Sequence, residues 1–135
     1  MTSKALIKSF YESDLANDET VIDQFYHKDC IIFWNSSKGL SERNFDEISL
    51  FFKGVRESYN DLRFDTTHLL EEDNLVTARY TLYACTIESE GDEIPLAHYI
   101  CIYHIKDNKI HRAYEISQPA DKDTIDSNAF SEIKL

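Results

Sequence analysis

The sequence predicts an α+β domain in which helices come first and a curved antiparallel sheet follows. Three observations support this. Residues 62–118 hold four strand-like runs that are separated only by short polar turns. Two helical pieces, one short strand and one amphipathic helix precede them. Helices packed on such a sheet form a second layer, and pockets commonly open between two layers of this kind.

The first elements are short. Thr2 or Ser3 can cap a helix over about residues 4–16, whose apolar positions recur at helical spacing, and Asn17-Asp18 interrupts the pattern. A second short helix follows. The β-branched and aromatic run at 30–34 then predicts a strand, which the polar turn cluster at 35–39 ends.

The third helix has the clearest signal. Asn44 can cap it, and Glu47 stands three residues later, as in a capping box. Apolar residues at helical spacing then predict one wide face. That face comprises Ile48, Phe51, Phe52, Val55 and Tyr59.

The meander follows this helix. Its predicted strands are Leu62–Leu70, Leu75–Ile87, Ile94–Ile105 and Ile110–Ser117. Asn74 and Asn108 lie in the tight turns, where a left-handed residue is favoured. Pro95 stands at the start of a strand, where it removes no ladder donor.

Composition restricts the possible partners. The chain has 135 residues, enough for one domain with its own core, and residues 119–135 read as a polar tail. Its formal charge of −11 argues against nucleic acid and anionic membranes, which need a cationic face. Three cysteines without a Cys-x-x-Cys motif, behind a polar N-terminus, predict reduced thiols in a cytoplasmic protein.

The order of elements and three short motifs resemble a known superfamily. Residues 72–80 read Glu-Asp-Asn-Leu-Val-Thr-Ala-Arg-Tyr, residues 107–110 read Asp-Asn-Lys-Ile, and residues 113–115 read Ala-Tyr-Glu. Over about residues 3–118, the chain resembles the nuclear-transport-factor-2-like superfamily, and within it the SnoaL-like group. The resemblance implies an α+β cone: three N-terminal helices on a curved antiparallel sheet that encloses a pocket. Such proteins are usually dimers.

This chain lacks some of the residues that each known mechanism of this superfamily requires. Ketosteroid isomerases have an Asp base at the end of the first strand, where this chain has Asn35, and a second Asp where it has Cys101. SnoaL-like cyclases often carry a late Asp in the last strand, where Gln118 stands. The resemblance therefore argues against steroid isomerisation by the familiar mechanism.

Limonene-epoxide hydrolases give a partial match. They use Arg-x-Asp on the long strand, an Asp on the last strand and a water-holding Asn. The matching residues are Arg79, Thr81, Glu115 and Asn35, so one carboxylate is lost and the other is a Glu. The resemblance thus implies an incomplete triad.

Both faces of the sheet are substantially apolar, so periodicity does not show which face lines the pocket. The resemblance does select one. The expected catalytic residues are Glu115, Arg79 and Asn35. The expected ligand-binding residues are Phe33, Phe52, His68, Thr81, Tyr83, Tyr99, Cys101 and Gln118. The opposite face would form a homodimer through Tyr80, Leu82, Ile100, Ile102, Tyr114 and Ile116.

Glu115 is the leading catalytic candidate. Beside Tyr99 and Cys101 its carboxyl would be desolvated and its pKa raised, as a general acid or base requires. Two alternatives are a structural ion pair with Arg79 and a surface position. Asn35 would orient a water or a ligand carbonyl, or would simply serve as a turn residue.

We expect neither a metal nor a cofactor. His98 and His104 are six residues apart on one strand, roughly 20 Å, which is too far to share an ion. His104 and His111 flank one hairpin, but no further ligand is placed beside them.

The predicted function is binding of a small, largely apolar organic molecule, with cofactor-independent isomerase, cyclase or hydrolase chemistry. The alternative is a non-catalytic ligand-binding or protein-interaction module.

Overall fold

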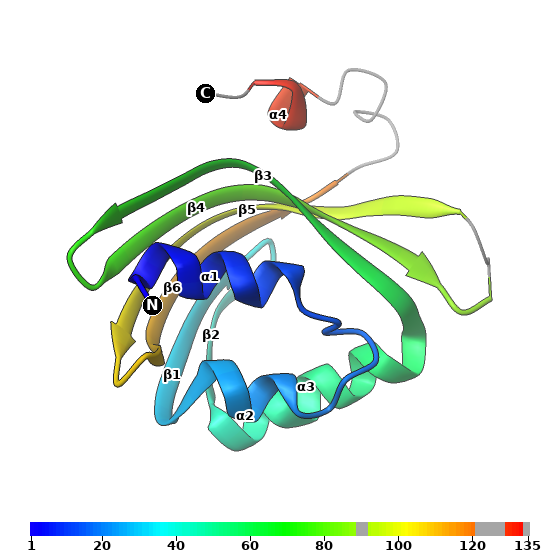
Figure 1. Cartoon of the computed structure of the whole chain (residues 1–135). Coiled ribbons are helices and arrows are strands. Elements are labelled where there is room, and N and C mark those ends of the chain that lie inside the picture. Colours follow the sequence, from blue (N-terminus) through cyan, green and yellow to red (C-terminus); the bar gives the residue numbers. More distant parts are fainter. Residues whose placement is uncertain (89–91, 121–128, 134–135) are drawn as a thin grey trace.

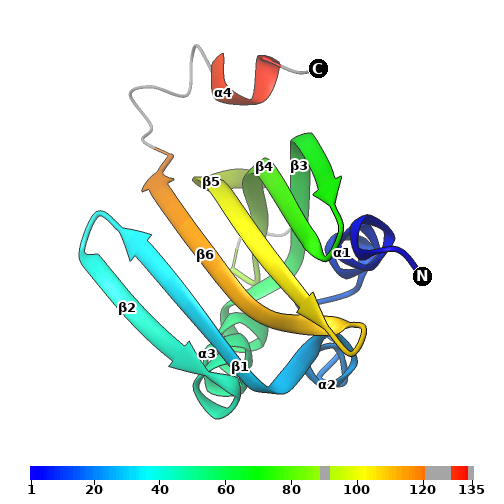
Figure 2. The ribbon, with the colours of Figure 1, turned by 90° about the vertical axis from the view of Figure 1, so that its left-hand side faces the viewer.

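The computed structural model shows one six-stranded sheet that curves around two of its helices (Figures 1 and 2). The structure describes residues 1–88, 92–120 and 129–133. The strands are β1 (Tyr26–Ser36), β2 (Gly39–Asn44), β3 (Tyr59–Glu72), β4 (Leu75–Thr86), β5 (Glu93–Lys106) and β6 (Lys109–Pro119). Their order in the sheet is β2-β1-β6-β5-β4-β3. The predicted α+β class with a curved sheet is confirmed.

Two features of the sheet differ from the prediction. The sheet is mixed rather than wholly antiparallel, because β1 runs parallel to β6. A second strand, β2, also precedes the third helix and pairs with β1 through a turn at Gly39, whose φ is 101°. Most of its residues are polar, so neither strand propensity nor alternation predicted it.

The helices begin where the capping residues predict. The Thr2 hydroxyl caps α1 (Ser3–Glu12), which ends earlier than the expected residue 16. After α2 (Val21–Phe25) and the first hairpin, Asn44 and Glu47 form the predicted capping box of α3 (Phe45–Ser58). None of the helices in the described part of the chain is long and apolar enough to cross a membrane.

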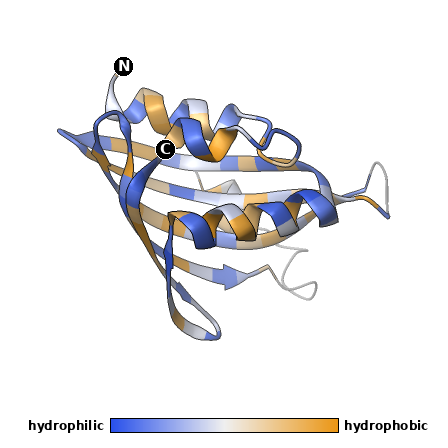
Figure 3. Ribbon diagram, turned by 90° about the horizontal axis from the view of Figure 1, so that it is seen from below, coloured by the Kyte–Doolittle hydropathy of each residue, from blue (hydrophilic) through white to orange (hydrophobic). Residues whose placement is uncertain are grey.

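The helices α1, α2 and α3 lie on the concave face of the sheet, which carries Tyr80, Tyr99 and Tyr103. α1 packs on β3 and β4, while α3 contacts β1, β2 and β3. Figure 3 shows both helices lying across the strands, with apolar and hydrophilic residues alternating along each. Between the sheet and the helices α1 and α2, the side chains form a close-packed core that includes the fully buried Ile7 and Ile110. Between the sheet and α3 there is a cavity.

A short C-terminal segment covers part of the opposite, convex face, which carries Ile100, Ile102 and Tyr114. This segment, α4 (Ala129–Glu132), packs on β3 and β4 on the side away from α1 and α3 (Figure 1).

Candidate active site

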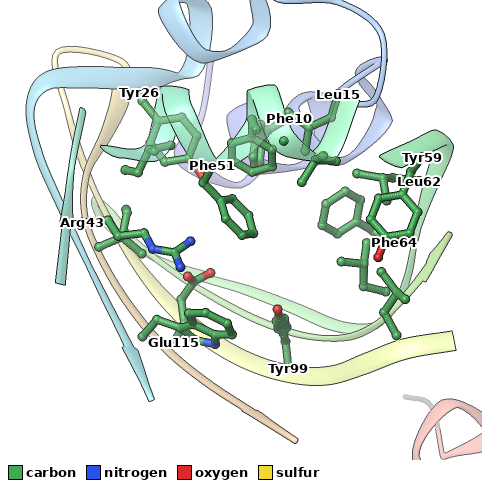
Figure 4. A pocket seen from close by; sticks show the side chains of 18 of the residues that line it. Phe10, Leu15, Tyr26, Arg43, Phe51, Tyr59, Leu62, Phe64, Tyr99 and Glu115 are labelled. Carbon is green, nitrogen blue, oxygen red and sulfur yellow. The ribbon is translucent and has the colours of Figure 1, made fainter. Parts of the chain in front are cut away.

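A cavity of about 470 Å³ opens between α3 and the concave face (Figure 4). Aromatic and aliphatic side chains form most of its wall. The aromatic residues include Phe10, Phe51, Phe52, Phe64, Tyr80 and Tyr99. Glu115 and Arg43 are the only charged residues among the described ones that line it. Such a cavity suits a small, mostly apolar organic molecule with a polar group at one end.

Glu115 supplies the acidic group of the cavity. It lies on β6, where the strand register pairs it with Cys101 on one side and Trp34 on the other. The Cys101 thiol donates to Glu115 Oε2 over 3.5 Å. Burial raises the pKa of Glu115 from 4.5 to about 7, although the thiol contact and the Arg43 charge both lower it. Protonated and ionised forms of Glu115 therefore coexist near neutral pH.

Arg43 supplies the cationic group. It lies on β2 opposite Ile32, and directly opposed residues of two strands share a face, so both line the cavity. Its Cζ lies 4.2 Å from the ring centroid of Phe51 and 5.1 Å from that of Trp34. Figure 4 shows the guanidinium and the Glu115 carboxyl pointing toward one another. Arg43 was not predicted as a site residue because it lies in strand β2, a polar segment whose sequence has no apolar pattern.

Tyrosine hydroxyls and one thiol surround the base of the cavity. Tyr11 Oη and Tyr103 Oη share a hydrogen bond of 2.7 Å, and the Cys101 thiol lies 3.8 Å from Tyr80 Oη. The Tyr80 and Tyr99 rings stack with centroids 5.0 Å apart. Burial raises the pKa of each of these hydroxyls and of the thiol, so all remain neutral hydrogen-bond donors.

The predicted inner face of β4 is wrong. Tyr80 and Leu82 line the cavity, whereas Arg79, Thr81 and Tyr83 lie on the convex face. The register explains the error. Tyr80 is paired directly with Tyr99 across the β4–β5 ladder, so the two must share a face. The resemblance had placed Tyr99 inside and Tyr80 outside.

Arg79 and Thr81 bind the C-terminal segment, and Arg79 does not contact Glu115 as expected. Arg79 Nη1 donates to the carbonyl oxygens of Phe130 and Ile133, and its guanidinium lies 3.6 Å from the Phe130 ring centroid. Ser131 Oγ donates to Thr81 Oγ1 over 2.7 Å. The expected pairing of Arg79 with Glu115 is therefore not formed.

The remaining predicted residues divide between the two faces. Phe52 and Tyr99 line the cavity, and Cys101 lies buried against Glu115. Phe33 and Asn35 line a second, smaller hollow of about 250 Å³ on the convex face, which Glu115 also borders, and neither of the two lines the cavity.

His68 and Gln118 are not among the lining residues of the cavity either. His68 Nδ1 bonds the Thr67 hydroxyl, and Gln118 is exposed and paired in register with His98. Among the residues that the structure describes, no group of three or more His, Cys, Asp or Glu is arranged to hold a metal ion. All three cysteines are free thiols.

Comparison with known proteins identifies the family and the fold. The SnoaL-like domain model matches residues 7–113. No curated protein sequence matches significantly. IdmH, a putative polyketide cyclase from Streptomyces antibioticus, is 15% identical over 98% of this chain and 100% of its own, with a TM-score of 0.69.

Two further solved structures share the fold. AclR, a putative hydroxylase from Streptomyces galilaeus, is 16% identical over 85% of this chain and 87% of its own, with a TM-score of 0.68. An epoxide hydrolase of M. tuberculosis, resembling the limonene-epoxide type, is 9% identical over 85% and 81%, with a TM-score of 0.66. At these identities the structures show a common fold, and the domain match establishes the family. The chain belongs to the SnoaL-like domain family.

Proposed function

We propose that the protein binds a small, largely apolar organic molecule in the cavity and moves a proton on it without a cofactor. One observation carries this proposal: a desolvated, half-buried carboxyl with a pKa of about 7 faces a mostly apolar cavity. A group that titrates near the working pH is suited to both accept and donate a proton. The proposal retains Glu115 from the predicted catalytic set and replaces Arg79 with Arg43.

The chemistry would proceed in two steps. Ionised Glu115 removes a proton from a carbon next to a carbonyl, and the C–H electron pair moves onto the carbonyl oxygen to give an enolate. The Arg43 charge stabilises that oxyanion. Where a C=C bond of the substrate is conjugated with the enolate, protonated Glu115 then returns the proton to the γ carbon, the double bond shifts toward the re-formed carbonyl, and an isomer results. Alternatively, the enolate carbon attacks a second carbonyl of the same molecule, whose oxygen takes the proton from Glu115. Proton transfer by a positioned side chain contributes about 10²–10⁴-fold to a rate.

The competing function is a binding module without catalysis. It is favoured by the single carboxyl of the cavity, since Glu115 is the only acidic residue among its described lining residues. Both readings share the ligand class and differ only in whether Glu115 transfers a proton.

Deuterium exchange at an activated carbon separates the two functions. We expect the protein to accelerate exchange of the benzylic α-protons of 2-tetralone in D₂O, followed by proton NMR. Glu115→Gln should abolish the acceleration, because an amide cannot accept the proton. Glu42→Gln, at an exposed position on β2, is the control and should retain it. No acceleration by the wild-type protein at a 2-tetralone concentration that saturates binding, or equal acceleration by Glu115→Gln, would exclude the catalytic function.

We also propose a homodimer through the convex face, in a cytoplasmic protein with reduced thiols. Ile100, Ile102, Tyr114 and Ile116 are each between 43% and 59% exposed on neighbouring strands. Adjacent apolar side chains of this size commonly mark an interface. Tyr80 and Leu82 no longer belong to it, because they line the cavity.

Sedimentation velocity tests this interface. The wild-type protein should sediment as a dimer, and Ile102→Lys should convert it to a monomer because the charge would be buried in the interface. Leu40→Lys replaces an exposed leucine on β2 and should leave the dimer intact. A wild-type monomer, or an Ile102→Lys dimer, would refute the proposed face.

A further inference from the structure

Arg43 has a geometry that the proton-transfer proposal does not by itself require. Its guanidinium lies at the wall of an apolar cavity, with Cζ 4.2 Å from the ring centroid of Phe51 and 5.1 Å from that of Trp34. The Trp34 Nε1 in turn donates to Ser117 Oγ over 2.8 Å. Contact with two aromatic rings restricts the guanidinium and leaves N–H donors available.

No partner satisfies that guanidinium within the described residues. The ion pairs found there join His27 to Asp107, Lys28 to Asp23 and Arg63 to Glu93. None of the hydrogen bonds between described groups involves the Arg43 guanidinium. Three other arginines are occupied: Arg79 donates to backbone carbonyls of the C-terminal segment, Arg63 forms two bonds to Glu93, and Arg112 donates to the carbonyl oxygen of Asp29. Arg43 thus presents unused donors to the interior of the cavity.

The nearest acidic group does not cancel this charge at mildly acidic pH. Glu115 points toward Arg43, but its carboxyl is mostly neutral below pH 7. The hydroxyls of Tyr80 and Tyr99 and the Cys101 thiol are neutral as well. The charged wall of the cavity is then cationic, in a chain whose net charge is −11. A fixed cation with free donors in an apolar enclosure favours a ligand that brings one anionic group.

We propose that the ligand is an organic carboxylate: a largely apolar molecule whose single carboxylate group receives a bidentate pair of hydrogen bonds from Arg43. The ring system of the ligand would lie against Tyr99, Phe64 and Leu62, on the side of the cavity away from Arg43. This inference rests on the proposed function, because it assigns a substrate class to the same cavity. It adds that Arg43 selects the ligand. A guanidinium has five N–H donors, so Arg43 can bind this carboxylate and still stabilise the enolate oxyanion, while Glu115 moves the proton.

A matched pair of probes tests the inference. Binding of 2-naphthoate and of 2-naphthylmethanol is measured at pH 6 by isothermal titration calorimetry. The two probes share a ring system and differ in charge. Wild-type protein should bind the carboxylate at least about tenfold more tightly, which is the scale of a charge-assisted bidentate pair. Arg43→Met should reduce carboxylate affinity by about that factor and leave alcohol affinity within about twofold.

Two further variants keep the test decisive. Arg43→Lys keeps the charge and should preserve part of the preference, which distinguishes charge from a change in shape if the Met variant folds poorly. Arg56→Met removes an arginine of α3 that does not line the cavity and should change neither affinity. The inference is overturned if the carboxylate binds no more tightly than the alcohol, or if the preference survives in Arg43→Met. If the alcohol binds and the carboxylate binds no more tightly, the proposed function stands and the carboxylate inference fails. If neither probe binds, the proposed function and the inference both fail.

Discussion

Glu115→Gln is expected to stabilise the protein above neutral pH and to flatten part of its pH dependence. The pKa of Glu115 is about 7 in the folded chain and 4.5 for an ordinary Glu. Between these values the folded state binds the proton more tightly than the unfolded state does. The free energy of unfolding therefore falls as pH rises through this window. A difference of about 2.5 pKa units corresponds to about 3 kcal/mol.

Urea unfolding at a series of pH values measures this effect. The difference in unfolding free energy between wild type and Glu115→Gln should shift by about 3 kcal/mol in favour of the variant from about pH 4 to pH 8. Taking the difference removes the contributions of the other carboxylates, which both proteins share. Glu42→Gln should follow the wild-type curve. Parallel curves for wild type and Glu115→Gln would show that the carboxyl is not desolvated.

Tyr103→Phe is expected to destabilise the protein by about 1–2 kcal/mol, since it leaves the Tyr11 hydroxyl without its partner at the base of the cavity. Tyr103 is only 2% exposed, so water does not readily replace the lost bond. Thermal or urea unfolding measures the loss.

The double variant Tyr11→Phe with Tyr103→Phe is the control for this effect. Removing both hydroxyls leaves no unpaired group, so the double variant should be more stable than the sum of the two single changes predicts. Strict additivity would mean that the two hydroxyls are not coupled in solution.

The sequence predicted the parts of the fold that depend on local signals. Asn44 and Glu47 marked the start of α3 because a capping box is formed by residues three positions apart. Turn residues separated the strands of the meander for the same reason. The parallel pairing of β1 with β6 joins segments about 80 residues apart, and no local pattern specifies it. The polar strand β2 was missed because its stability comes from pairing with β1.

The candidate site was predicted in part. Glu115 and Tyr99 lie on the expected face, because the resemblance fixed β5 and β6. It misplaced β4, whose two faces are similarly apolar, so that a one-residue error in alignment exchanges Tyr80 for Arg79. The contacts of Arg79 with Phe130 and Ile133 reach more than 50 residues along the chain. No local sequence pattern specifies contacts between residues so far apart, so only the folded structure reveals them.

The most direct test of the account is the pKa of Glu115 in the free protein. It can be measured by following the side-chain carboxyl carbon of Glu115 by NMR from about pH 4 to pH 9, with Glu115→Gln to assign the signal. We expect a midpoint near 7, because burial in the cavity disfavours the charged form more than Arg43 and the Cys101 thiol favour it. A midpoint at or below 4.5 would mean a solvated or ion-paired carboxylate and would contradict proton transfer by Glu115.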